Sequence, residues 1–264
     1  MKPVHAVIIA VTAVTLLPAA GTAQGLARKV TDAADGEVRM SFAARPDVCG
    51  DGVNTIRFGK RGRVGRSEDD DDVTYGDSDC PCNNGPVRVV FRVRDHQVTK
   101  VRTLVGGAWR SDSRAVDLGT VSAKDAVATL FAIANDRRNS GGDDAVFPTT
   151  LADSVTIWPE LLRLARKDDA PHETRKQAVF WLSQVASDSA TAGLADLAET
   201  EETEIRKQAV FGLSQRPRDE GVPALIKVAR TNNSAEVRRS ALFWLGQSED
   251  PRALALFEEI LTKR

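Results

Sequence analysis

A ten-residue segment that recurs three times constrains the fold of this chain more than any other feature. It begins at Arg175, Arg206 and Arg238 as RKQAVFWLSQ, RKQAVFGLSQ and RRSALFWLGQ, so the period is 31 or 32 residues. Its apolar residues follow helical spacing, and a second, looser apolar helix separates the copies. We expect helix pairs at residues 158–167 with 174–185, 188–199 with 203–215, and 219–230 with 235–247, followed by a single helix at 251–263.

Each expected pair has an apolar face that one pair cannot bury, so neighbouring pairs must stack as an α-solenoid. Trp181 and Trp244 share one position of the repeat, where the middle copy has Gly212. Two interpretations of these tryptophans stay open: packing between repeats, or contact with a ligand.

The segments EIRKQAVFGLSQ from Glu204 and EVRRSALFWLGQ from Glu236 resemble the second helix of HEAT repeats. The pattern resembles in particular the short bacterial type called PBS-lyase HEAT-like repeats, and the resemblance extends over about residues 156–264. It implies a helical array that binds a protein or peptide partner. The same family includes deoxyhypusine hydroxylases, which bind iron through His-Glu pairs. The corresponding positions in this chain are Lys176-Gln177, Lys207-Gln208 and Arg239-Ser240, which cannot bind iron in that way.

Residues 37–120 predict a small β-containing domain, so the whole chain is expected to have an α+β fold. Alternating apolar residues are typical of half-buried strands. They predict a strand at residues 37–43, a hairpin at 86–105 that turns at Asp95-His96, and one weak strand at 55–58.

All three cysteines of the chain lie in this domain. A bridge between Cys80 and Cys82 would span a single residue, whereas Cys49 could pair with either of them. We favour Cys49–Cys82, because Cys82 directly precedes the hairpin and its position is better fixed.

An acidic run, Glu68 followed by Asp69 to Asp72, lies in the polar stretch before the hairpin. A solvated loop is the simpler interpretation, and a calcium site is the alternative. The spacing does not fit an EF-hand loop. We therefore expect no metal and no other cofactor.

Residues 1–23 have the pattern of a secretory signal peptide, with an apolar run at 7–17 and small residues up to Ala23. A membrane anchor is the alternative, but this run is shorter than the roughly 20 residues of a spanning helix. We expect cleavage before Gln24, a flexible N-terminus at 24–36, and a periplasmic or secreted mature chain without a membrane span.

Residues 121–155 form the junction between the two parts. Ser122 and Asp125 resemble a capping box before an amphipathic helix that ends near Asn135. A short helix is expected within residues 145–153. The junction should pack on the first repeat and cover its apolar edge.

The formal net charge of −1 disfavours nucleic acid as a partner. After signal-peptide cleavage only His96 and His172 remain as histidines, and the common catalytic motifs are absent from the sequence. We expect a non-enzymatic scaffold or adaptor. The alternative is an exported enzyme with its active site in the N-terminal domain.

Basic residues recur at one position of the repeat and could form a partner-binding ladder. Acidic residues recur nearby at Glu173, Glu204 and Glu236, so internal pairing is the competing interpretation. The candidate partner-binding residues are Arg175, Lys176, Arg206, Lys207, Arg238 and Arg239.

Overall fold

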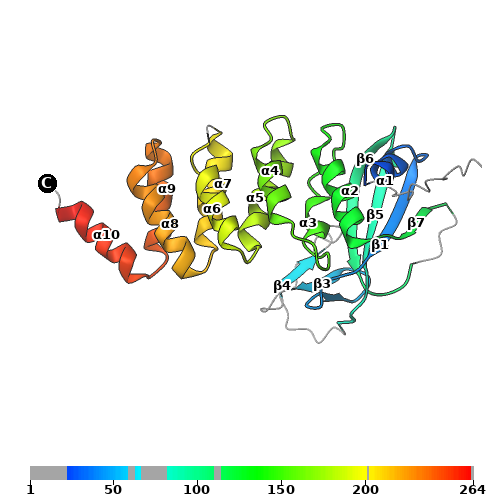
Figure 1. Ribbon diagram of the computed structural model, residues 1–264, viewed down its shortest axis with the longest axis horizontal. Coiled ribbons are helices and arrows are strands. Elements are labelled where there is room, and N and C mark those ends of the chain that lie inside the picture. The colour runs from blue at the N-terminus through cyan, green and yellow to red at the C-terminus, as the bar shows by residue number, and fades with distance from the viewer. Residues whose placement is uncertain (1–22, 59–62, 67–81, 110–113, 201, 263–264) are drawn as a thin grey trace, which may run out of the picture.

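The computed structural model describes residues 23–58, 63–66, 82–109, 114–200 and 202–262. Strands gather at one end of the molecule, and a row of helix pairs extends from them to the C-terminus (Figure 1). The predicted combination of a β-containing N-terminal part and a C-terminal α-solenoid is confirmed. The proposed signal peptide, except for Ala23, lies outside the described residues.

A four-stranded sheet with the order β6-β5-β1-β7 organises the N-terminal part. β1 pairs antiparallel with β5 and parallel with β7. The sequence did not predict β7, because the alternation of Val116 and Leu118 is short and Gly119 interrupts it. The bounds are Gly36–Phe42 for β1, Val87–Arg94 for β5, Gln97–Val105 for β6 and Val116–Thr120 for β7.

The β5–β6 hairpin turns at Asp95 and His96, as the sequence predicts. Both have positive φ angles, 51° and 61°, which a two-residue hairpin turn of matching twist requires. The backbone N–H of Asp95 donates to Asp35 Oδ1 at 2.9 Å, and His96 Nδ1 lies 3.1 Å from the carbonyl oxygen of Thr31. These contacts hold the turn against the N-terminal segment.

A second, three-stranded sheet with the order β2-β3-β4 lies beside the first. The weak strand expected at residues 55–58 is β3 (Thr55–Phe58), and it is joined by β2 (Cys49–Gly50) and β4 (Arg63–Arg66). The expected Cys49–Cys82 disulfide is present, with a Cα–Cα distance of 5.3 Å. Cys80 and the acidic run Glu68 to Asp72 lie outside the described residues.

One face of the larger sheet is covered by α1 (Ala23–Thr31) and α2 (Ala123–Asn135). The segment expected to be a flexible N-terminus, residues 24–36, is therefore helical over most of its length. The reason is burial, because Val30 of α1 is completely shielded from solvent. The expected cap of α2 is present, since Ser122 Oγ accepts a hydrogen bond from Asp125 N at 3.0 Å.

The C-terminal helices begin and end close to the predicted positions and pack as antiparallel pairs in a single row (Figure 1). Within the described part of the chain, none of the helices has the length and apolar character that crossing a membrane requires. The bounds are Trp158–Arg166 for α4, His172–Gln184 for α5, Asp188–Leu197 for α6, Thr203–Ser214 for α7, Arg218–Thr231 for α8, Ala235–Gly246 for α9 and Pro251–Thr262 for α10.

One continuous hydrophobic core extends from the sheet through the junction into the array. The short helix α3 (Val146–Thr149) packs against α5. At this contact Trp181 stacks on Phe147, with ring centroids 5.0 Å apart, and Phe58 of β3 lies 5.9 Å from the same indole. The junction thus joins the sheets and the array through packed side chains.

Candidate partner-binding surface

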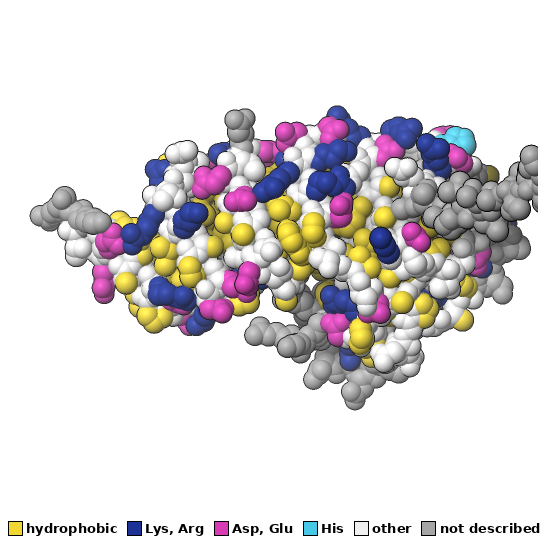
Figure 2. Space-filling view, in the orientation of Figure 1, with side chains coloured by type: hydrophobic (Ala, Val, Ile, Leu, Met, Phe, Trp, Pro, Cys, Tyr) yellow, Lys and Arg dark blue, Asp and Glu magenta, His cyan; other side chains and the backbone are white. Residues whose placement is uncertain are grey.

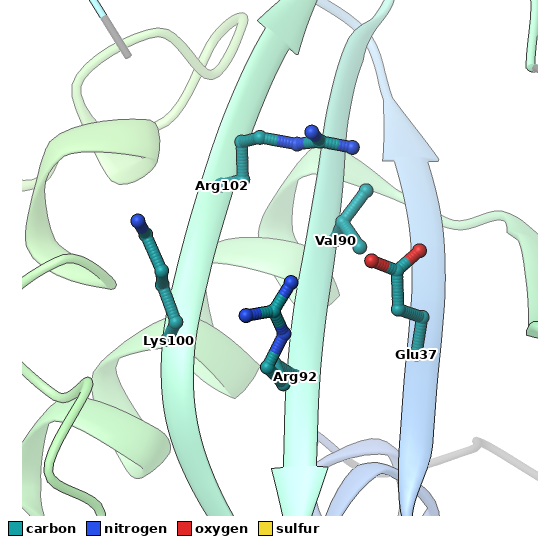
Figure 3. Close-up of a pocket in the computed structure, with 5 residues that line it drawn as sticks. All are labelled: Glu37, Val90, Arg92, Lys100 and Arg102. Atoms are coloured by element: carbon teal, nitrogen blue, oxygen red, sulfur yellow. The ribbon is translucent and has the colours of Figure 1, made fainter. Parts of the chain in front are cut away.

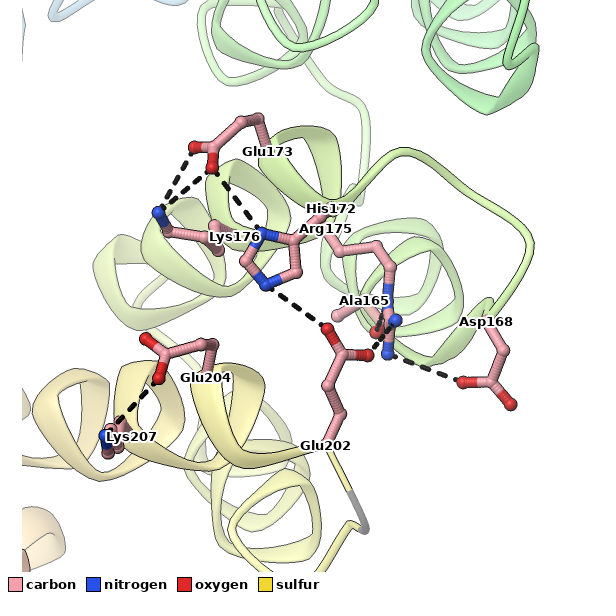
Figure 4. Close-up of polar contacts among 9 residues, drawn as sticks. All are labelled: Ala165, Asp168, His172, Glu173, Arg175, Lys176, Glu202, Glu204 and Lys207. Atoms are coloured by element: carbon pink, nitrogen blue, oxygen red, sulfur yellow. Dashed lines mark hydrogen bonds and ion pairs between the residues drawn. The ribbon is translucent and has the colours of Figure 1, made fainter.

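The first arginine of each repeated segment is part of the fold. Arg175 is only 5 % exposed and pairs with Glu202. Its Nε donates to the carbonyl oxygen of Ala165 at 3.0 Å, and Nη2 lies 3.5 Å from Asp168 (Figure 4). These contacts bind the end of α4 and the start of α7 to α5. Arg175 therefore tethers three helices and offers little surface to a partner.

Arg206 and Arg238 also bond close to their own helix starts. Arg206 Nη2 donates to Thr203 Oγ1 at 2.8 Å, and Arg238 Nη1 donates to the carbonyl oxygen of Asn232 at 2.7 Å. Guanidinium groups at this repeat position thus fasten the turns between helices. These partners are a hydroxyl and a backbone carbonyl, not the acidic side chains that the internal-pairing interpretation named.

The second basic residue of each segment is more exposed and lies in a chain of alternating charge. Lys176 Nζ is 3.2 Å from Glu173, and Lys207 Nζ is 2.8 Å from Glu236 on the next repeat. The hydrogen bond to Glu236 raises the pKa of Lys207, and the hydrogen bond from Lys207 lowers the pKa of Glu236. Exposed pairs of this kind contribute little to stability, so a partner could replace them at low cost.

Arg239 completes the set of second-position cations. Its side chain is exposed on α9, and its charge contributes to lowering the pKa of Glu236, after the larger effect of Lys207. The second-position cations therefore occupy equivalent places on successive helices. The first-position arginines, by contrast, already form hydrogen bonds within the array.

His172 bridges two repeats at the same end of the array. Its Nε2 lies 3.2 Å from Glu202, and its Nδ1 lies 3.5 Å from Glu173 (Figure 4). The described residues contain no group of three or more His, Cys, Asp or Glu side chains placed to hold a metal ion.

Sequence reasoning missed an aromatic strip, which we define as Phe180, Phe211 and Phe243. Each residue occupies the same repeat position on α5, α7 or α9, and Phe243 is 57 % exposed while the other two are half-buried. The signal was present in the sequence, because the same letter recurs at the same place in all three copies. Figure 2 shows hydrophobic side chains along the visible face of the array, between charged side chains at its margins.

The two tryptophans pack between elements of the fold. Trp244 lies against Phe211 of the preceding repeat, with ring centroids 5.2 Å apart, whereas Trp181 faces Phe147 of the junction. At the equivalent position of α7, a Cβ added to Gly212 would lie 3.0 Å from Leu194 Cδ2. The middle repeat is packed too closely there for a large side chain.

Comparison with known proteins supports the architecture. The family of HEAT repeats matches residues 158–241 and 196–264, and the N-terminal part is not matched. A solved crystal structure of an engineered protein is similar to this chain at 20 % identity and a TM-score of 0.28, covering 52 % of this chain and 60 % of that one. No curated protein matches the chain. Residues 158–264 of this chain therefore form an array of HEAT repeats.

Proposed function

We propose that this protein is an exported, non-enzymatic scaffold that binds a protein or peptide partner through its helical array. The observation that carries the proposal is the HEAT-repeat array itself, because HEAT repeats commonly mediate protein interactions. The continuous core joins that array to the N-terminal part, so both would be presented to a partner in a fixed arrangement.

The aromatic strip is the part of the array best suited to contact. Large aromatic side chains supply much of the binding energy in protein interfaces, and Phe243 is more than half exposed on α9. Lys207 and Arg239 lie near the start of the helices that carry Phe211 and Phe243. We place the partner on the strip, with these cations at its margin.

Affinity capture followed by binding measurements with the purified partner tests this proposal. Phe243→Ser should weaken binding about tenfold, which corresponds to about 1.4 kcal/mol. Leu254→Ser is a matched control, because Leu254 is 60 % exposed on α10 and lies outside the strip. Equal affinities for the wild-type chain and the Phe243→Ser variant, with both folded, would reject the strip as the contact.

Export rests on the N-terminal sequence pattern and is supported by the Cys49–Cys82 disulfide, since such bonds persist in oxidising compartments. N-terminal sequencing of the protein recovered from the periplasm or medium should begin at Gln24. Recovery of a chain that still contains residues 1–23 would contradict this part of the proposal.

A further inference from the structure

The face of the larger sheet turned away from α1 and α2 is rich in arginine. Strand register brings Arg39, Val90 and Arg102 into one row across β1, β5 and β6, and Glu37, Arg92 and Lys100 into the next. Arg88 lies opposite Ser41 in a third row. The open-face groove is defined here by its cationic residues Arg39, Arg88, Arg92, Lys100 and Arg102.

A hollow of about 510 Å³ lies over this face. Val90 and Leu104 contribute apolar side chains to it, and Trp109 and the loop from Asp51 to Asn54 also line it. A smaller hollow adjoins it and shares Val90 and Arg102 (Figure 3). The two hollows follow the strands and form one elongated groove.

Positive charge exceeds negative charge in the groove, although the whole chain has a formal net charge of −1. Among the described residues, the groove has five cations and the carboxylates of Glu37, Asp51 and Asp117 near them, an excess of two positive charges. Asp117 is bound to Arg39 at 3.0 Å.

Asp51 directs its carboxylate to its own loop, where Oδ1 accepts hydrogen bonds from the backbone N–H groups of Val53, Asn54 and Thr55. Arg92 and Arg102 have no carboxylate at ion-pairing distance within the part of the chain that the structure describes. Figure 3 shows their guanidinium groups turned toward the same stretch of surface beside Val90.

Arg88 builds the wall of the groove and adds charge to it. Its side chain is 3 % exposed and donates to the carbonyl oxygens of Gly52 and Ala108, both at 2.7 Å. Burial and the nearby charge of Arg102 lower the pKa of Arg88. Arg39 and Arg88 also lie 5.0 and 4.9 Å from the ring centroid of Trp109. These contacts hold the loops around Gly52 and Ala108 in place. They also leave the buried cation of Arg88 next to the exposed cation of Arg102.

We propose that the open-face groove binds a short acidic segment of a partner protein in an extended conformation. Arg92 and Arg102 are diagonal neighbours on β5 and β6, a separation of roughly 7–8 Å. This is close to the spacing of about 6.6 Å between alternate side chains of an extended peptide. Glutamates at alternate positions would therefore point toward Arg92 and Arg102, and the side chains between them would point away from the sheet. This site is separate from the aromatic strip of the array.

A short segment fits the groove better than a long polyanion. The helical array has no such positive excess, because residues 156–264 carry 16 basic and 17 acidic side chains. A nucleic acid or a long sulfated polysaccharide would continue beyond the groove onto surface without a net positive charge. A short acidic peptide would lie entirely within the groove.

Fluorescence anisotropy with the full chain and a labelled ten-residue peptide of alternating Glu and Val tests the proposal. Arg92→Glu/Arg102→Glu should weaken binding at least about tenfold, because it exchanges attraction for repulsion at two exposed positions. Arg92→Lys/Arg102→Lys should retain most of the affinity. Arg137→Glu is the matched control, since Arg137 is exposed in the loop after α2.

Added salt should weaken binding of the wild-type chain. Thermal unfolding of each variant shows that the protein is folded. Equal affinity for the wild-type chain and Arg92→Glu/Arg102→Glu overturns the proposal, as does an equal loss in Arg137→Glu. Tighter binding of pyrophosphate or of a sulfated oligosaccharide at the same residues also overturns it. Phe243→Ser should leave peptide binding unchanged, so the outcome is independent of the proposed role of the array.

Discussion

Arginine side chains have two different roles in this chain, and their surroundings distinguish them. Arg216 is buried between repeats, where it donates to Thr191 Oγ1 at 2.8 Å and to the carbonyl oxygens of Ser183 and Ser187 at 3.2 Å. Its Nη2 also pairs with Glu220 at 2.7 Å. Arg102, by contrast, is exposed beside another cation. Satisfied donors hold helices together, whereas unpaired exposed ones are available to bind an anion.

Replacing Arg216 should therefore be costly. Arg216→Ala removes one member of a buried ion pair and the donor to the carbonyl oxygen of Ser183, so the free energy of unfolding should fall by about 3–5 kcal/mol. Chemical denaturation measures this change. Arg218→Ala, at an exposed position two residues further on, should change it by less than about 0.5 kcal/mol. Similar values for both variants would show that the network around Arg216 contributes little.

The start of α10 gives a pH-dependent prediction. Hydrogen bonds from Arg252 Nε and Nη2, both 2.8 Å long, and from the backbone N–H of Arg252 lower the pKa of Asp250 from 3.8 to about 2. The folded-state pKa lies below the unfolded one, so this stabilisation is complete above about pH 3.8 and is lost as pH falls through about 2.

Asp250→Asn should accordingly lower the melting temperature at neutral pH, and its difference from the wild-type chain should shrink as pH falls from about 3.8 to about 2. Thermal unfolding followed by circular dichroism across that interval measures the effect. A difference that stays constant with pH would exclude the Asp250–Arg252 contact as its source.

The secondary-structure elements differ in how far the sequence could predict them. The array helices bury one apolar stripe each, so their period and bounds follow from local spacing. β2 and β4 pair with the nearby β3 but are only two and four residues long, too short to show an alternating pattern. β7 pairs with β1, which is distant in the sequence, so local patterns do not reveal this pairing. The same distinction applies to the sites. Arg88 and Arg92 alternate visibly along β5, but only strand register places Arg39 and Arg102 beside them.

Trp181 and Trp244 occupy one repeat position but join different elements, which makes them a matched pair. Trp181→Ala should loosen the contact of α5 with Phe147 and Phe58, at a cost of about 2 kcal/mol for a half-buried aromatic side chain. It should also increase proteolytic cleavage between α3 and α4, whereas Trp244→Ala should not. Limited proteolysis of both variants distinguishes local loosening at the junction from general destabilisation.

The molecule as a whole is a continuous stack of packed elements, and its side chains are less buried at the C-terminal helix than in the middle. The core passes without interruption from β5 through α2 and α5 to α9, so these elements should protect one another. Within the described residues, α10 packs against α8 and α9. Just Ala253 and Leu256 are buried in it, and Leu254, Ile260 and Leu261 remain exposed. A helix that buries so few side chains opens more readily than the well-packed helices before it.

Native-state hydrogen exchange should measure this difference in local stability between α10 and the rest of the stack. Amides of β5 and α5 should exchange only through global unfolding and therefore report the same free energy, because opening either element exposes the shared core. Amides of α10 should exchange faster, since fraying of this helix exposes few buried side chains. Trp181→Ala should separate the values for β5 and α5 by weakening the contact between them. If β5 and α5 already differ in the wild-type chain, the two parts unfold independently, and a fixed arrangement of the open-face groove and the aromatic strip cannot be maintained.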